Sequence, residues 1–245
     1  MTDALLRVQD LCAGYGTSRV LDGVSFSMGV EAVALIGRNG MGKTTLCNTI
    51  MGLVRATSGE IAFHGAPIAN KTPEKIAGCG ISYVPQGRRL FPSLTVDEHL
   101  TMLAKGTRGK RWTRAEVYDL FPRLGERRRN GGAQLSGGEQ QMLAVGRALL
   151  LNGSLVIMDE PSEGLAPTIV DTLIDVVHRL VTEGVAVLVV EQNLRAAVQM
   201  ADRQLVMVSG RIQAETTAAD LIARPELQHM YLGVEGAGTL KREMS

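Results

Sequence analysis

Short, continuous apolar runs recur along the chain. The clearest are residues 32–36 (AVALI), 155–158 (LVIM) and 186–190 (AVLVV). Runs of this length and continuity are typical of strands that are buried on both faces. Longer amphipathic stretches follow near residues 167–182 and 194–201. Strands that alternate with helices predict an α/β fold, in which helices cover both faces of a parallel sheet.

Weaker signals predict the remaining elements. Further strands are expected at residues 5–8, 23–28, 60–64, 81–84 and 204–208, a helix over 43–51, and a tight turn at Ser209-Gly210 that leads into 211–214. Residues 92–151 differ, because a hydroxyl residue is followed three positions later by glutamate in Thr95/Glu98, Thr113/Glu116 and Ser136/Glu139. This capping-box pattern marks helix starts and predicts a helical subdomain.

Composition excludes several classes of protein. The 245 residues are 45% hydrophobic and carry a net charge of +1, which gives no electrostatic case for nucleic acid as a partner. No apolar stretch approaches the roughly 20 residues of a membrane span, and no export signal is visible. Three scattered cysteines form neither a disulfide framework nor a zinc pattern, so a reducing cytoplasm is expected. The 28 glycines need a local explanation.

One glycine cluster matches the phosphate-loop pattern G-x-x-x-x-G-K-[ST] between a predicted strand and a predicted helix. The motif consists of Gly37, Arg38, Asn39, Gly40, Met41, Gly42, Lys43 and Thr44, and Thr45 follows it. Its glycines let successive backbone amides point at an anion, and the helix start adds a positive dipole end. Lys43 is expected on the β- and γ-phosphates of ATP, and the Thr44 hydroxyl on Mg²⁺.

Acidic and amide side chains complete the candidate site. Asp159 ends the apolar run at 155–158, where it would hold Mg²⁺, and Glu160 follows it as the candidate general base. Gln86 follows the strand at 81–84 and is a candidate contact to Mg²⁺ and the attacking water. Tyr15 lies between two glycines, so its ring is a candidate for stacking on adenine, with an ordinary packing role as the alternative.

A second helix start has the features of an anion site. It comprises Ser136, Gly137, Gly138, Glu139 and Gln140. A capping box explains Ser136 and Glu139, but it does not explain two glycines at early helix positions, where glycine is destabilising. Two anion-binding helix starts with one set of acids favour a head-to-tail dimer, in which this helix covers the nucleotide of the partner.

These motifs together resemble the ATP-binding subunits of ABC transporters over about residues 5–232. The resemblance implies a P-loop NTPase core with a parallel sheet, a small antiparallel β subdomain and a helical subdomain that holds the LSGGE signature. It implies one domain over 1–232, with its core at about 1–91 and 152–232, its helical subdomain at about 92–151, and a flexible tail at 233–245. By the same resemblance Tyr15 is the adenine-stacking aromatic, and Gln86 belongs to the glutamine loop.

Two positions depart from the family pattern. Ala166 stands where an aspartate usually follows the catalytic glutamate, and Gln192 stands at the place of the switch histidine, next to the γ-phosphate. Glutamine can donate a hydrogen bond to a γ-phosphate but cannot titrate as histidine does.

The strings VPQGRRLFPSLTVDEHL, DEPSEGLAP and VVEQN resemble the second ATPase of branched-chain amino-acid importers. That likeness implies ATP and Mg²⁺ as cofactors, a second and different ATPase subunit (or a homodimer in isolation), two membrane permeases, and an external substrate-binding protein acting indirectly. It implies a peripheral place on the cytoplasmic face of the cell membrane. A urea or amide importer and, less favoured, a soluble ABC ATPase outside transport are the alternatives. The exposed segment after Gln86, with Phe91 and Leu94, is a candidate permease contact.

Overall fold

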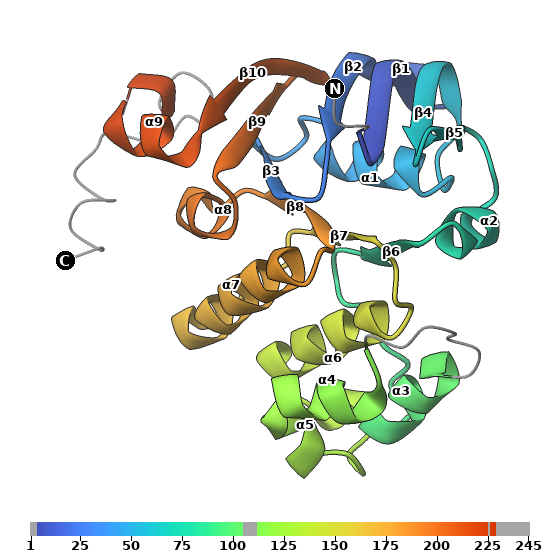
Figure 1. Cartoon of the computed structure of the whole chain (residues 1–245), viewed down its shortest axis with the longest axis vertical. Coiled ribbons are helices and arrows are strands. Elements are labelled where there is room, and N and C mark those ends of the chain that lie inside the picture. Colours follow the sequence, from blue (N-terminus) through green and yellow to red (C-terminus); the bar gives the residue numbers. More distant parts are fainter. Residues whose placement is uncertain (1–3, 105–111, 225, 229–245) are drawn as a thin grey trace.

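A six-stranded sheet forms the centre of the molecule in the computed structural model, which describes residues 4–104, 112–224 and 226–228 (Figure 1). Its strands lie in the order β10-β9-β3-β8-β7-β6. Their bounds are β3 (Ala32–Ile36), β6 (Ile81–Val84), β7 (Leu155–Asp159), β8 (Ala186–Glu191), β9 (Arg203–Val208) and β10 (Arg211–Thr217). All neighbours run parallel except β9 and β10, which form a hairpin. The predicted parallel sheet is therefore confirmed, with one antiparallel edge strand.

A smaller antiparallel sheet packs beside the first, in the order β2-β1-β4-β5. Its strands are β1 (Leu6–Tyr15), β2 (Ser18–Met28), β4 (Ala56–Phe63) and β5 (Ala66–Pro67). Helix α1 (Lys43–Ile50) shares one apolar cluster with this sheet and with one face of the central sheet. The phosphate-loop helix is therefore held between the two sheets (Figure 1).

Helices cover the opposite face of the central sheet. These are α7 (Pro167–Thr182) and α8 (Leu194–Met200), while the short helices α2 (Pro73–Gly78) and α9 (Ala218–Ala223) lie at the periphery. Strands β7 and β8 are buried at every position, as their continuous apolar runs predict. The predicted turn at Ser209-Gly210 is also present, because both residues adopt a positive φ between β9 and β10.

The described residues between 92 and 151 are mostly helical, as the capping boxes predict. It contains α3 (Val96–Ala104), α4 (Arg114–Leu120), α5 (Pro122–Glu126), a 3₁₀ turn (Gly132–Gln134) and α6 (Gly137–Leu149). All three predicted capping boxes form. These helices lie away from the antiparallel sheet in Figure 1, and α6 joins the apolar cluster beneath β6 and β7. No helix in the described ranges is long and apolar enough to cross a membrane.

Candidate functional site

The loops that carry the predicted site residues leave the same edge of the central sheet. The phosphate loop follows β3, Gln86 follows β6, and Asp159 ends β7, while Gln192 follows β8. Parallel neighbours bring their carboxyl ends to one edge, and ligands of open α/β sheets bind in the crevice there. Sheet order also places β8 between β3 and β7. Segments that are far apart in sequence therefore meet at this edge.

A cavity of about 300 Å³ lies at this edge. Its lining consists of Val20, Asn39, Gly40, Gly42, Lys43, Thr44, Thr45, Gln86 and Glu160. Gly42 directly precedes α1 at φ 103°, and Gly40 adopts φ 79°, conformations that favour glycine. The loop therefore curls ahead of the helix start, as an anion-binding backbone nest requires.

The Lys43 side chain is buried and bonds to the backbone of the phosphate loop. This side chain is only 3% exposed, and its Nζ donates to the carbonyls of Gly37 (2.8 Å) and Arg38 (3.2 Å). The same Nζ lies 3.3 Å from Oε1 of Glu160, whose side chain is 8% exposed. The candidate phosphate-binding cation and the candidate base are thus paired with each other within the cavity.

Asp159 and Thr44 form the candidate metal site. The Thr44 hydroxyl donates to Asp159 Oδ1 at 3.2 Å, and the Tyr83 hydroxyl lies 3.2 Å from Oδ2. Burial raises the pKa of Asp159 and the neighbouring Glu160 adds to this, while the two hydroxyl donors oppose it. Thr44 and Asp159 present oxygen atoms, the ligand type that Mg²⁺ prefers. Among the described residues no cluster of three or more His, Cys, Asp or Glu side chains could hold a metal. The two oxygen donors of Thr44 and Asp159 would suit a Mg²⁺ ion whose other ligands came from phosphates and water.

Gln86 contacts two carboxylates in the structure. Its Nε2 donates to Glu160 Oε2 at 2.9 Å and to Glu163 Oε2 at 3.0 Å. Glu160 itself adopts φ 49°, a left-handed conformation that is strained for a non-glycine residue. The contact of Glu163 was not predicted, because no motif marks that position as part of the site.

The backbone after Gln86 is unusual. Gly87, Arg88 and Arg89 all adopt a positive φ, of 78°, 61° and 44°. Arg88 reaches the signature segment, where its Nη1 donates to Gln140 Oε1 at 3.2 Å. Two consecutive left-handed arginines carry a conformational cost, so surrounding contacts hold this loop in place.

The signature segment begins α6 as predicted. The Ser136 side chain accepts from the Glu139 amide, and Glu139 Oε2 accepts from the Ser136 amide. A Cβ on Gly138 would lie 2.9 Å from the Ile169 side chain, which explains the second glycine by close packing. The three atoms nearest to a Cβ on Gly137 would belong to the end of the Arg88 side chain, at 3.2–3.5 Å. The segment does not line the phosphate cavity of its own chain.

The other predicted residues lie outside the cavity lining. Tyr15 is 53% exposed, so its ring face is open, and Gln192 is also exposed. Ala166 occupies the N-cap position of α7 and makes no side-chain capping hydrogen bond. The buried neighbour Glu191, which the sequence did not single out, accepts from the amides of Ser162 (2.9 Å) and Asn193 (3.3 Å) and so ties the two loops together. Burial raises its pKa.

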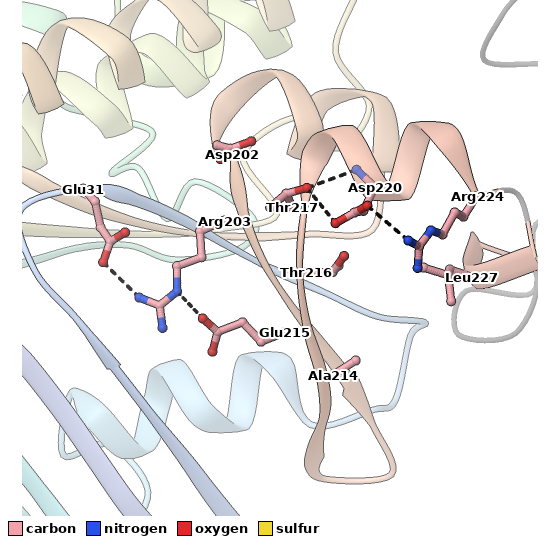
Figure 2. A pocket seen from close by; sticks show the side chains of 10 residues that line it. All are labelled: Glu31, Asp202, Arg203, Ala214, Glu215, Thr216, Thr217, Asp220, Arg224 and Leu227. Carbon is pink, nitrogen blue, oxygen red and sulfur yellow. Dashed lines mark hydrogen bonds and ion pairs between the residues drawn. The ribbon is translucent and has the colours of Figure 1, made fainter.

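A second cavity, of about 700 Å³, lies beside the β9–β10 hairpin and α9 (Figure 2). Arg203 points between Glu31 and Glu215 there, at 2.9 Å and 2.7 Å from their carboxylate oxygens. Arg203 thus pairs with both glutamates, and Arg224 lies 3.7 Å from the Asp220 carboxylate. The Thr217 hydroxyl accepts from the Asp220 amide to cap α9, so this hydroxyl also serves the fold.

Comparisons with known proteins identify the family of the chain. A family model described as "ABC transporter" matches residues 21–163. The chain is 42% identical to the high-affinity branched-chain amino acid transport ATP-binding protein BraG of Pseudomonas aeruginosa, over 89% of this chain and 95% of that protein. It is 32% identical to the probable branched-chain amino acid transport ATP-binding protein LivF of Archaeoglobus fulgidus, over 94% and 99%. Among solved structures, an ATP-binding cassette of an ABC transporter in its ADP conformation matches with a TM-score of 0.79 and 28% identity, over 95% of this chain and 100% of that one.

Proposed function

This chain belongs to the ABC transporter family, as one of its ATP-binding subunits, and we propose that it hydrolyses ATP to drive import of branched-chain amino acids. The observation that carries the proposal is the meeting of Lys43, Thr44, Asp159 and Glu160 at one edge of the sheet. The cargo rests on the relatives, because BraG and LivF are described as branched-chain amino acid transport proteins. Their descriptions favour this cargo over urea.

The residues at and beside the cavity have distinct roles in the proposed reaction. Lys43 and the amides of the phosphate loop bind the β- and γ-phosphates. Thr44 and Asp159 hold Mg²⁺, which neutralises charge that develops on the phosphate oxygens. Glu160 accepts a proton from the attacking water. Gln86 orients the water beside Glu160, and Gln192 donates to the γ-phosphate from the loop after β8.

The contacts of Lys43 and Glu160 lead us to propose the order in which these residues act. In the structure Lys43 is occupied by two carbonyls and by Glu160. A bound triphosphate competes for the ammonium and releases Glu160, so the base becomes available when its substrate arrives. Gln86, which donates to the same carboxylate, moves with that change.

Dimerisation completes the proposed site. Ser136, Gly137 and Gly138 present a positive helix start outside the phosphate cavity of their own chain. We propose that they cover the nucleotide of a partner ATPase subunit, while Tyr15 stacks on adenine from the chain that holds it. The partner is a different ATPase in the working complex, or a second copy of this chain in isolation.

We also propose that residues 1–232 form one ATPase domain, with the segment 92–151 as its helical subdomain and two permeases bound on the cytoplasmic face of the membrane. A groove of about 310 Å³ between the Gln86 loop and α6 offers a permease contact. Its lining, among the residues that the structure describes, includes Arg88, Arg89 and Arg147 and no acidic residue. Phe91 is 49% exposed nearby, with the Arg147 guanidinium 5.7 Å from its ring centroid.

The test of the enzymatic role is Glu160→Gln. The variant keeps the shape of the side chain but removes the proton acceptor, so ATP binding should persist while turnover falls by about 10²-fold or more. Glu126→Gln, at an exposed surface ion pair, is the matched control and should retain turnover. Turnover of Glu160→Gln at the wild-type rate would overturn the assignment of the base.

Cargo is tested by uptake. A strain deleted for this gene should lose uptake of radiolabelled leucine and regain it when the wild-type gene is supplied, but not when Glu160→Gln is supplied. Loss of urea uptake with unchanged leucine uptake would favour the alternative importer. Pull-down of the native complex should recover membrane permeases, and Phe91→Ala with Leu94→Ala should weaken that recovery.

A further inference from the structure

We propose that Tyr83 is a positioning residue for the metal site, whose hydroxyl holds the Asp159 carboxylate in the orientation that Mg²⁺ binding requires. This inference rests on the proposed function of the cavity. Tyr83 lies on β6, three residues before Gln86, and no motif of the sequence marks it.

The geometry around Asp159 carries the inference. Asp159 is 1% exposed, and each of its carboxylate oxygens faces a hydroxyl: Thr44 at Oδ1 and Tyr83 at Oδ2, both at 3.2 Å. Tyr83 also lies 3.3 Å from Asn48 Oδ1 on α1. A hydroxyl has one proton, and an ionised carboxylate is a stronger acceptor than a neutral amide oxygen. The Tyr83 hydroxyl therefore donates its proton to Asp159.

The two hydroxyls have different roles in the proposed site. Thr44 belongs to the phosphate loop, and its hydroxyl is the proposed metal ligand, which can bind a cation through an oxygen lone pair and keep its proton for Asp159 Oδ1. Tyr83 is no proposed ligand, and its hydroxyl is the donor that the structure describes at the other oxygen, Oδ2. Hydrogen bonds of this outer kind fix the orientation of metal-binding carboxylates.

The position of Tyr83 in the chain adds a second consequence. Strand β6 pairs with β7 in parallel, with Tyr83 opposite Ile157, and both strands run directly into the loops of the site. The hydroxyl thus ties β6, ahead of Gln86, to β7 at Asp159. A shift of the Gln86 loop that moved β6 would change the position of the Tyr83 hydroxyl relative to Asp159.

The test is Tyr83→Phe, which removes one oxygen and leaves the ring. Tyr118→Phe is the matched control, because the Tyr118 hydroxyl donates to Asp97 at 2.8 Å within the helical segment, away from the cavity. Binding of a fluorescent, non-hydrolysable ATP analogue is measured in EDTA and during titration with Mg²⁺. ATPase rates are measured over the same titration, together with Mn²⁺ binding by electron paramagnetic resonance.

In Tyr83→Phe the Mg²⁺ concentration for half-maximal nucleotide binding should rise by about tenfold, the lower end of effects at such outer partners. Mn²⁺ should bind correspondingly more weakly. Nucleotide affinity in EDTA and kcat at saturating Mg²⁺ should stay near wild type, and Tyr118→Phe should match wild type throughout. Equal metal titrations for all three proteins, or equal loss of binding with and without metal, would overturn the inference. A wild-type protein without Mg²⁺-dependent ATP hydrolysis would instead overturn the proposed function.

Discussion

Substitution of Gly138, the second glycine of the signature, tests whether close packing requires a glycine at this position. In Gly138→Ala the new Cβ would lie 2.9, 3.2 and 3.3 Å from Cγ1, Cδ1 and Cγ2 of Ile169. Carbon atoms normally approach to about 3.5–4.0 Å, and both branches of the isoleucine are involved, so a rotamer change does not clear the contact. Overpacking of this kind costs about 1–3 kcal/mol.

An opposing effect reduces the expected change. Alanine is favoured over glycine within a helix by up to about 1 kcal/mol, and Gly138 lies in the first turn of α6. The net expectation is a loss of about 1 kcal/mol in the free energy of unfolding. For a chain of this size that corresponds to a fall in Tm of about 2–4 °C. Thermal unfolding in the absence of nucleotide measures it without any contribution from ligand binding.

Two further variants test the reasoning. Gly137→Ala places a Cβ against the flexible guanidinium of Arg88, at 3.2–3.5 Å, so its Tm should equal or exceed that of wild type. Ile169→Ala removes the three atoms that clash. Adding Gly138→Ala to this variant should therefore not lower the free energy of unfolding, and the higher helix propensity of alanine should raise it. The packing explanation is refuted if Gly138→Ala unfolds at or above the temperature of Gly137→Ala. It is also refuted if Gly138→Ala lowers the stability of the Ile169→Ala variant as much as that of wild type.

Two other predictions concern buried charge. Lys43→Met should weaken ATP binding by at least about tenfold, since it removes a charged hydrogen-bond donor from the cavity, and isothermal titration calorimetry of ATP in EDTA measures the change. Unaltered affinity would show that the phosphates bind elsewhere. Burial raises the pKa of Glu191, so the folded state favours its protonated form and wild-type stability falls as pH rises through the raised pKa. Glu191→Gln keeps an acceptor for the Ser162 amide without this loss, so its Tm relative to wild type should increase as the pH rises above the ordinary glutamate value of 4.5; a pH-independent difference would contradict the argument.

The elements that the sequence predicted well have strong local signals. The run AVALI coincides with β3, and Pro at its first position and a regular apolar stripe define α7 as Pro167–Thr182. Strands β1 and β2 are longer than predicted, because register shifts after Val8 and Leu11 break their polar–apolar alternation. Helices α2 and α9 were not predicted, since six residues are too few to show a helical period.

The candidate site could likewise be predicted only in part from the sequence. The phosphate loop, Asp159, Glu160 and the signature could be found because each is a contiguous string whose chemistry depends on local spacing. Contacts between strings could not be found. Tyr83 reaches Asp159 across 76 positions, and Gln86 reaches Glu163 across 77, through pairings of strands that no local pattern specifies.

The order of strands has a consequence for the time at which the protein acquires its site. Strand β3, which leads into the phosphate loop, pairs only with β8 and β9 within the described sheet, and these end at residues 191 and 208. A ribosome adds about 5–20 residues per second, so β3 waits roughly 10–35 s for its neighbours. During that interval AVALI is an apolar strand with two open edges on a nascent chain. Such segments are prone to aggregation, and a factor that shields them during translation should raise the yield of active subunit.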